Sequence, residues 1–88
     1  MLKATLAIWD SAMQAYNLPI TVPTIQMAIR SFADEVNRTD PSNHLNAHPD
    51  DYELHHLANW DEQTGHYEQL KPTCVARAKD HYYAKGQS

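Results

Sequence analysis

The sequence is short of cysteine, of glycine and of long apolar runs, and each shortage excludes a class of protein. Its 88 residues contain one cysteine, Cys74, which excludes an intramolecular disulfide and a cysteine-based zinc site. Beside Val75 and Ala76, this cysteine is expected to pack as a small apolar residue in a reducing cytosol. Only two glycines, together with 42% hydrophobic and 20% charged residues, argue against disorder and predict a globular protein.

The absence of a long apolar run also bears on where the protein acts. No segment approaches the length of a membrane span, and the N-terminus lacks a signal-peptide cleavage pattern. We therefore expect no membrane partner and a protein that stays inside the cell that makes it. A chain of 88 residues suits a single domain over residues 1–88. A monomer of this size buries only about 60% of its unfolded surface, so a homo-oligomer is a reasonable expectation.

Positive charge is scarce as well. Seven Lys and Arg residues stand against eleven Asp and Glu residues, giving a net charge of −4. Strong non-specific binding to duplex DNA leaves a basic footprint, and this composition lacks one. The six histidines add positive charge only below about pH 6.5. A strong DNA binder is therefore disfavoured unless the basic residues gather on one face.

The first part of the chain predicts a strand followed by an amphipathic helix. Apolar residues occupy alternate positions over residues 2–9, which is typical of a strand. Over residues 25–36 they recur at helical spacing and form one apolar stripe. Thr21 or Thr24 can cap this helix, and Asn37 with the following proline ends it. The residues between strand and helix are expected to be a connection.

The second part predicts two strands and another helix. Residues 38–51 are polar and turn-rich, and we expect a long surface loop there. A strand over 52–60 enters a hairpin closed by Gly65, and 66–70 returns as a third strand. A second helix is predicted from Pro72 to Gly86, with Val75, Ala78 and Tyr82 along its apolar stripe. The predicted fold class is therefore α+β, in the order β-α-β-β-α, with a small antiparallel or mixed three-stranded sheet and two helices on one face.

The histidines raise the question of a metal site. His44 and His48 stand four apart, but they flank a loop and enclose no glutamate, unlike the zinc-binding helix motif. His55 and His56 are adjacent on a predicted strand and so point to opposite faces. We expect solvated or hydrogen-bonding histidines, with no metal and no cofactor.

Catalytic motifs are not found either. Asp50 and Asp51 are expected to form a turn, and Asp61 to bond the backbone of its own hairpin. The sequence has no glycine-rich phosphate loop and no serine in a nucleophile motif. We therefore expect no catalytic residues and a protein that is not an enzyme.

Aromatic side chains on the strands are the more informative group. If Asp61 pairs with His66, then Trp60 faces Tyr67 and both project from one side of the sheet. Exposed aromatic rings on a sheet can stack the bases of single-stranded nucleic acid. The alternative is that these rings pack under the helices or fill a dimer interface.

Basic residues gather only weakly, towards the C-terminus. The candidate phosphate contacts there are Lys71, Arg77, Lys79 and Lys85. Arg77 and Lys79 point in different directions on a helix, and a solvated helix face is the alternative. The candidate nucleic-acid-binding residues are thus Trp60, Tyr67, Lys71, Arg77, Lys79 and Lys85.

Two blocks of sequence carry a family resemblance. The first reads Ala28-Ile29-Arg30-Ser31-Phe32 with Asp34 and Val36-Asn37. The second reads His48-Pro49-Asp50-Asp51-Tyr52-Glu53-Leu54 and continues into Trp60-Asp61-Glu62-Gln63-Thr64-Gly65. This ordered set, over about Thr24 to Lys79, resembles the small nonstructural protein from the fifth open reading frame of gokushoviruses, single-stranded DNA phages of the Microviridae.

The resemblance implies a role in viral DNA replication, at the stage where single-stranded genomes are made. It implies a non-enzymatic factor in the host cytoplasm, outside the virion, that touches single-stranded DNA or the replication-initiation protein. The alternative is an oligomeric protein-interaction module without DNA contact, which the acidic charge and small size favour. A metal-dependent enzyme built on the histidines is a third hypothesis.

Overall fold

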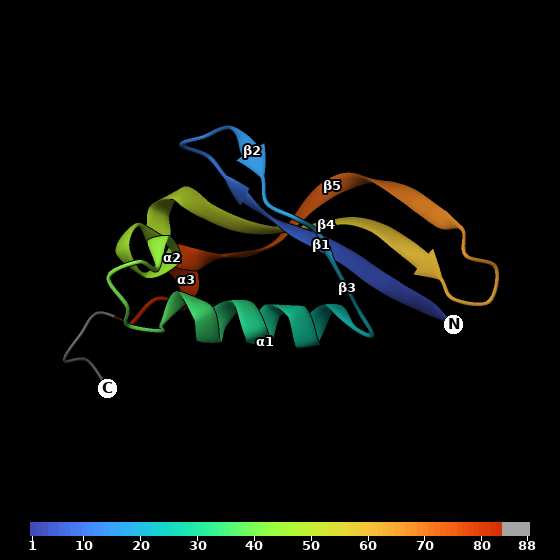
Figure 1. The fold of residues 1–88 in the computed structure, drawn as a ribbon, viewed down its shortest axis with the longest axis horizontal. Coiled ribbons are helices and arrows are strands. Elements are labelled where there is room, and N and C mark those ends of the chain that lie inside the picture. The colour runs from blue at the N-terminus through green and yellow to red at the C-terminus, as the bar shows by residue number, and fades with distance from the viewer. Residues whose placement is uncertain (84–88) are drawn as a thin grey trace.

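The computed structural model describes residues 1–83, which form a five-stranded antiparallel sheet with one long helix along a face and short helices at one end (Figure 1). The elements in chain order are β1 (Leu2–Asp10), β2 (Ala15–Tyr16), β3 (Ile20–Val22), α1 (Ile25–Val36), α2 (His44–Ala47), a 3-10 turn (Pro49–Asp51), β4 (Tyr52–Asp61), β5 (Tyr67–Arg77) and α3 (Ala78–His81). Among these residues, no helix is long and apolar enough to cross a membrane.

The strand β1 lies in the middle of the sheet. It pairs with β4 along its whole length, and β2 and β3 pair with its other edge. The strand order is β2-β1-β4-β5, and β3 continues the edge that β2 begins. The sequence predicted three strands and a plain connection before the helix. That part was wrong, because the chain folds back on β1 twice before α1 begins.

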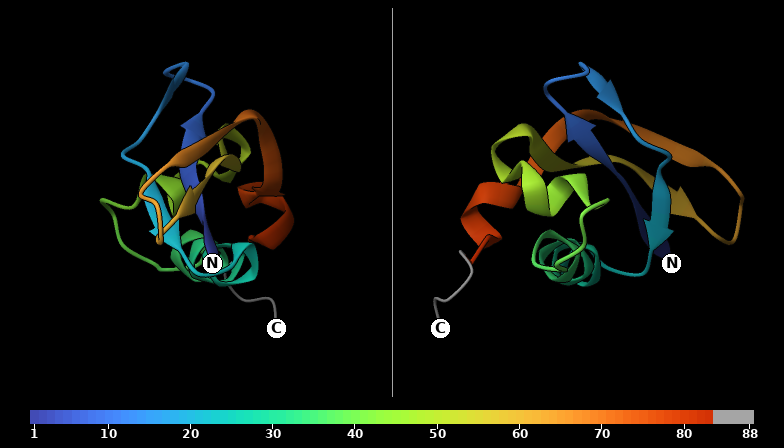
Figure 2. Two further views of the ribbon diagram at one scale, coloured as in Figure 1. Left: turned by 90° about the vertical axis from the view of Figure 1, so that its right-hand side faces the viewer. Right: turned by 60° about the vertical axis from the view of Figure 1, so that its left-hand side comes forward.

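The helix α1 forms where the sequence predicted it. Thr24 is its N-cap, and its side-chain oxygen accepts a hydrogen bond from the Met27 backbone nitrogen. The helix lies along one face of the sheet, as Figures 1 and 2 show. Asn37 ends it and also ties the C-terminal segment to it, because its side chain donates to the His81 carbonyl oxygen and accepts from the Tyr83 backbone nitrogen.

The core lies between α1 and the face of the sheet that it covers, which we call the inner face. Leu6 and Val36 are completely buried, and Phe32 is 4% exposed. The remaining buried members of this cluster are Ala4, Ala28, Leu54, Ala76 and Ala78. Small residues on the strands let the helix approach the sheet closely, so much of the core is made of alanine.

The predicted second helix was wrong in its first half. The strand β5 runs to Arg77, and α3 covers only residues 78–81; Gly86, its predicted end, lies outside the described residues. Pro72 does not break the strand, because the β4–β5 pairing shifts register there and passes over residues 70–72. A proline is tolerated at such an irregularity, where its missing N–H removes no ladder hydrogen bond. Val75, Ala78 and Tyr82 do pack on the core.

The segment between α1 and β4 is more ordered than the predicted surface loop. It contains α2 and the 3-10 turn, and Asn43 is only 3% exposed. The Asn43 side-chain nitrogen donates to the Glu35 and Arg38 carbonyl oxygens, each at 2.8 Å. Its side-chain oxygen accepts from the Leu45 backbone nitrogen. One buried amide thus joins the end of α1 to the start of α2.

Candidate functional site

The face of the sheet that points away from α1 is called the outer face. It carries the side chains that are candidates for binding or catalysis. Residues that pair across an antiparallel ladder share a face. The pairings of β1, β4 and β5 therefore place on it Lys3, Thr5, Ala7, Trp9, Glu53, His55, Ala58, Trp60, Tyr67, Gln69, Cys74 and Arg77.

The predicted aromatic pair lies at one end of this face. Trp60 pairs with Tyr67, as the sequence indicated, and the hairpin closes with a 2.9 Å hydrogen bond from the Asp61 nitrogen to the His66 oxygen. Tyr67 is 62% exposed and Trp60 is half-buried. Lys3 lies opposite Trp60 and is paired with Glu62 at 3.2 Å. We call Trp60 and Tyr67 the hairpin-end pair.

The predicted basic residues are spread out. Lys71 and Arg77 are both exposed on β5, and at about 3.3 Å per residue they lie roughly 20 Å apart along the strand. The Arg77 side chain is bound to Asp80 at 3.1 Å. Lys79 is exposed on α3, and Lys85 lies outside the described residues. Within the described residues, Lys71 and Arg77 therefore do not form one basic patch.

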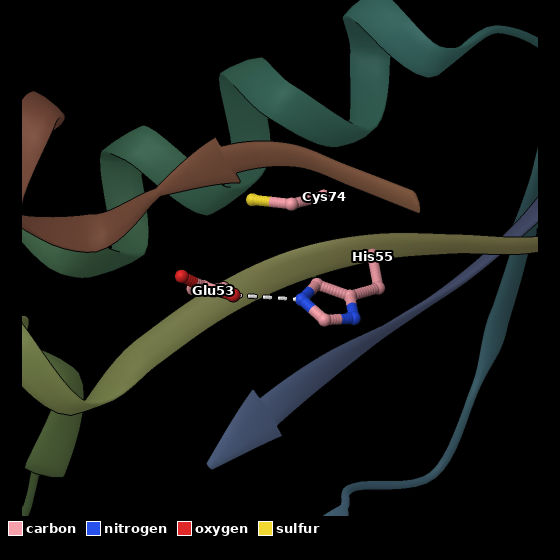
Figure 3. Close-up of side chains that lie close together, drawn as sticks. All are labelled: Glu53, His55 and Cys74. Carbon is pink, nitrogen blue, oxygen red and sulfur yellow. Dashed lines mark hydrogen bonds and ion pairs between the residues drawn. The ribbon is translucent and has the colours of Figure 1, made fainter. Parts of the chain in front are cut away.

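A second group on the outer face was not foreseen. His55 lies between Tyr16 and Glu53: Tyr16 Oη is 2.7 Å from His55 Nδ1, and Glu53 Oε1 is 2.8 Å from His55 Nε2. Cys74 pairs with His55 across the β4–β5 ladder. Figure 3 shows the side chains of Glu53, His55 and Cys74 close together. We call Tyr16, Glu53, His55 and Cys74 the polar cluster.

Aromatic rings hold the histidine of this cluster in place. The Trp9 ring lies nearly parallel to the His55 ring, with centroids 6.2 Å apart. The Tyr16 ring meets the His55 ring edge-on, with centroids 5.4 Å apart, and lies tilted against the Trp9 ring at 4.8 Å. The imidazole is therefore fixed by contacts to its face and edge as well as by its two hydrogen bonds.

The environment of Cys74 differs from the expected apolar packing. The residue is exposed rather than packed, which corrects that expectation, and its thiol lies beside a carboxylate. Partial burial of the thiol, followed by the charge of Glu53, raises the Cys74 pKa. The group is therefore a protonated thiol at neutral pH, with little intrinsic nucleophilicity.

The structure also explains why the sequence did not reveal the cluster. The spacing Glu53-x-His55 places two side chains on one face of a strand, and that was readable. Cys74 joins them only because β5 continues past Pro72, where a helix was predicted. Tyr16 joins them through β2, in a segment predicted to be a connection.

The other histidines and aspartates have simpler surroundings. His44 and His48 line a surface cavity of about 410 Å³ together with Asp10 and Asp51. In residues 1–83, the group of three metal-type ligands within reach of one another is Glu53, His55 and Cys74, not the loop pair. Asp61 accepts a hydrogen bond from the Gln63 backbone nitrogen, so it serves its own hairpin as expected.

Comparison with known proteins identifies the family. A family model described as Phage ORF5 protein matches residues 3–81, which is nearly the whole chain. No curated protein and no solved structure matches the sequence. The match confirms the resemblance found in the two sequence blocks, and the chain therefore belongs to the phage ORF5 protein family.

Proposed function

We propose that this phage protein is a non-enzymatic accessory factor, acting in the host cytoplasm and not in the virion, that promotes synthesis of the single-stranded viral genome. We propose further that it contacts single-stranded DNA with the hairpin-end pair. The observation that carries this proposal is the 62% exposure of Tyr67 beside its cross-strand partner Trp60. A sheet that only needed a core would not require a large ring in that position.

The chemistry of this surface favours base stacking over phosphate binding. Each base stacked on an aromatic side chain contributes about 1–3 kcal/mol, and every base offers a π-face. Among the described residues, the cations near the pair are few: Lys3 is bound to Glu62, and Arg77 lies at the other end of β5, bound to Asp80. Stacking of this kind has little sequence preference. Single-strand binders usually depend strongly on salt, and here the dependence should be weak because few cations are available for phosphate contacts.

The direct test is titration of a labelled single-stranded oligonucleotide, followed by fluorescence anisotropy at low salt. Trp60→Ala and Tyr67→Ala should each raise the Kd roughly 5- to 150-fold, the equivalent of about 1–3 kcal/mol of stacking. Tyr83→Ala is the matched control, because Tyr83 is 70% exposed but lies outside the sheet. That variant should bind like the parent protein.

The salt dependence sharpens this experiment. Each phosphate contact to a single strand contributes a slope of about −0.7 to log K against log salt, so Lys3, Lys71 and Arg77 together allow a slope of about −2 at most. A steeper slope would contradict a stacking mechanism. Absence of binding even at low salt would end the proposal of direct DNA contact and leave the replication-initiation protein as the partner.

A protein-interaction module is the second candidate, and a separate observation favours it. Leu18 is 86% exposed and Ile20 is 50% exposed, beside a small apolar cavity of about 160 Å³ between β3 and α1. Exposed apolar residues that adjoin a cavity are typical of interfaces. On this proposal, β3 and α1 contact a second copy of the chain.

Light scattering at micromolar concentration tests the second candidate. A dimer that Leu18→Asp converts to a monomer would support it. Met13→Asp is the matched control, because Met13 is 74% exposed on the turn between β1 and β2, and it should leave the mass unchanged. A parent protein that is already a monomer would end the proposal of a homo-oligomer.

A further inference from the structure

The polar cluster holds three side chains that are ligands for the same class of metal ion. A carboxylate oxygen of Glu53, a ring nitrogen of His55 and the sulfur of Cys74 all lie within 4.8 Å of one another. The first two share a face because they are two residues apart on β4, and the third is the cross-strand neighbour of His55 on β5 (Figure 3). We propose that Glu53, His55 and Cys74 bind one Zn²⁺ ion, with a fourth position open to solvent.

The distances suit such an ion. Zinc bonds of about 2.0–2.3 Å in a tetrahedral arrangement place neighbouring ligand atoms roughly 3.5 Å apart. The ligand atoms all lie within 4.8 Å of one another, and Glu53 Oε1 is 2.8 Å from His55 Nε2.

The histidine is already oriented for coordination. Metal-binding histidines usually have their second ring nitrogen held by a hydrogen bond, which fixes the tautomer and the direction of the ring. Tyr16 Oη provides this contact at His55 Nδ1, at 2.7 Å, and Nε2 is directed at Glu53 Oε1, 2.8 Å away. Because a carboxylate only accepts, Nε2 carries the ring proton in this structure, and coordination moves that proton to Nδ1, which then donates to Tyr16 Oη. The Trp9 ring lies along the imidazole and restricts its rotation.

The site is also accessible from solvent. A surface cavity of about 380 Å³ is lined by Glu53, Cys74, Arg77 and Asp80, among others. An ion can therefore enter from the side of Cys74, where that residue is exposed. The opening accounts for a fourth position filled by water rather than by a fourth side chain.

The donor set selects the class of ion. A thiolate is a poor ligand for Mg²⁺ and Ca²⁺, which prefer oxygen, whereas one oxygen, one nitrogen and one sulfur suit a borderline-soft ion such as Zn²⁺. One cysteine cannot build a cysteine-based zinc site, but it can complete a mixed one, with its thiol proton released to solvent as the sulfur binds the ion. The ion would join β4 to β5 on the outer face, which none of the helices in residues 1–83 covers. Small domains commonly gain stability from such a metal. This inference goes beyond the proposed function and does not depend on DNA contact.

The test uses the full chain, purified without a histidine tag and stripped with a chelator. Titration with Co²⁺ should give saturation at one equivalent, d–d absorption of tetrahedral type and a thiolate-to-cobalt charge-transfer band. Added Zn²⁺ should abolish these bands by displacement. Cys74→Ser should remove the charge-transfer band and weaken Zn²⁺ binding at least tenfold, and His55→Gln should weaken it similarly.

Matched controls separate this site from general histidine binding. His44→Gln and His48→Gln, in the loop before β4, should leave the cobalt spectrum and the affinity unchanged. Circular dichroism of each variant checks the fold, and Cys74→Ser is the critical variant because the side chain is exposed. A cobalt complex without a thiolate band, or Zn²⁺ affinity that Cys74→Ser leaves intact, would overturn the proposal.

Discussion

The inner and outer faces of the sheet are built from alternate residues of the same strands, yet they have different contents. On the inner face, Leu6 and Leu54 are 0% and 3% exposed and pack against α1. On the outer face, the same strands carry Trp9, His55 and Trp60, which are only partly buried. One face is a core, and the other holds rings, a thiol and a carboxylate.

This difference distinguishes the residues that the fold needs for its core from those that are available for another role. The buried inner-face residues, Leu6 and Leu54 among them, are accounted for by apolar packing, which is the dominant favourable contribution to folding. On the same face His56 and Asn59 bond each other at 3.0 Å. The outer face divides into two groups, because Thr5 and Ala7 between them are buried at 7% and 2% exposure. The hairpin-end pair and the polar cluster therefore have separate surroundings, and we assign them separate roles.

Substitutions on the two faces should differ most in stability. Phe32→Ala removes a ring that is 4% exposed and should lower the free energy of unfolding by about 3–5 kcal/mol. Domains of this kind are stable by only about 5–15 kcal/mol, so that variant should be close to unfolded. Tyr67→Ala should change the stability by less than about 0.5 kcal/mol. Urea denaturation followed by circular dichroism measures both.

One result would contradict this comparison of the two faces. If Tyr67→Ala were as destabilising as Phe32→Ala, the hairpin-end pair would be structural and its exposure would need no function. Tyr67→Phe is the control for the ring itself, since it removes only the hydroxyl group and should retain both stability and oligonucleotide affinity.

Much of the inner face could be predicted from the sequence, because periodicity reports one-sided burial. The first strand and α1 were found with the correct faces, and Thr24 was one of two proposed caps. The hairpin register at Trp60 and Tyr67 was also confirmed. These features depend on residues close in sequence, whose spacing and turn chemistry are directly readable.

The outer face could not be predicted to the same depth, because it depends on long-range pairing. Val75, Ala78 and Tyr82 are core residues, as expected, but the same spacing was interpreted as a helix. A strand that crosses Pro72 through a shift in register leaves no periodic signal. Without that strand, Cys74 could not be placed beside His55.

A loss of stability of intermediate size is expected when Asn43, on the helix side of the molecule, is replaced. Asn43→Ala removes a 3% exposed amide that makes three hydrogen bonds, and it leaves the Glu35 and Arg38 carbonyl oxygens without that donor. The loss should be about 1–3 kcal/mol in the free energy of unfolding. Asn46→Ala is the control, because that side chain makes a single bond, to the Val36 carbonyl oxygen. Equal losses in the two variants would show that the three Asn43 hydrogen bonds stabilise the fold no more than the single Asn46 bond does.

A smaller loss of stability is expected when Gly65, at the hairpin end, is replaced. Its φ of +75° lies in the left-handed region, and a Cβ there would meet nothing within 4 Å. Gly65→Ala should therefore destabilise by about 1 kcal/mol, from backbone conformation alone. Gly65→Asn should be milder, because asparagine tolerates this conformation. Denaturation midpoints measure the stability of the two variants relative to the parent. A loss in Gly65→Ala as large as that in Phe32→Ala would contradict the view that the hairpin end lies apart from the core.

The smallest effect is expected at the exposed end of α1, where Arg38 contacts Glu35 at 2.7 Å and Asp40 at 3.0 Å. Hydrogen bonds from Arg38 lower the pKa of Glu35, and bonds from Ser42 followed by Arg38 lower that of Asp40. A carboxylate with a lowered folded-state pKa stabilises the fold above its unfolded pKa, about 4, and loses that contribution as the pH falls through the lowered value. Arg38→Gln should therefore be slightly less stable than the parent at pH 7, and the gap should close in acid. Because both pairs are solvent-exposed, screening keeps the gap small, and 1 M salt should narrow it further. A gap that persists in acid would show that Arg38 stabilises the end of α1 by packing rather than by charge.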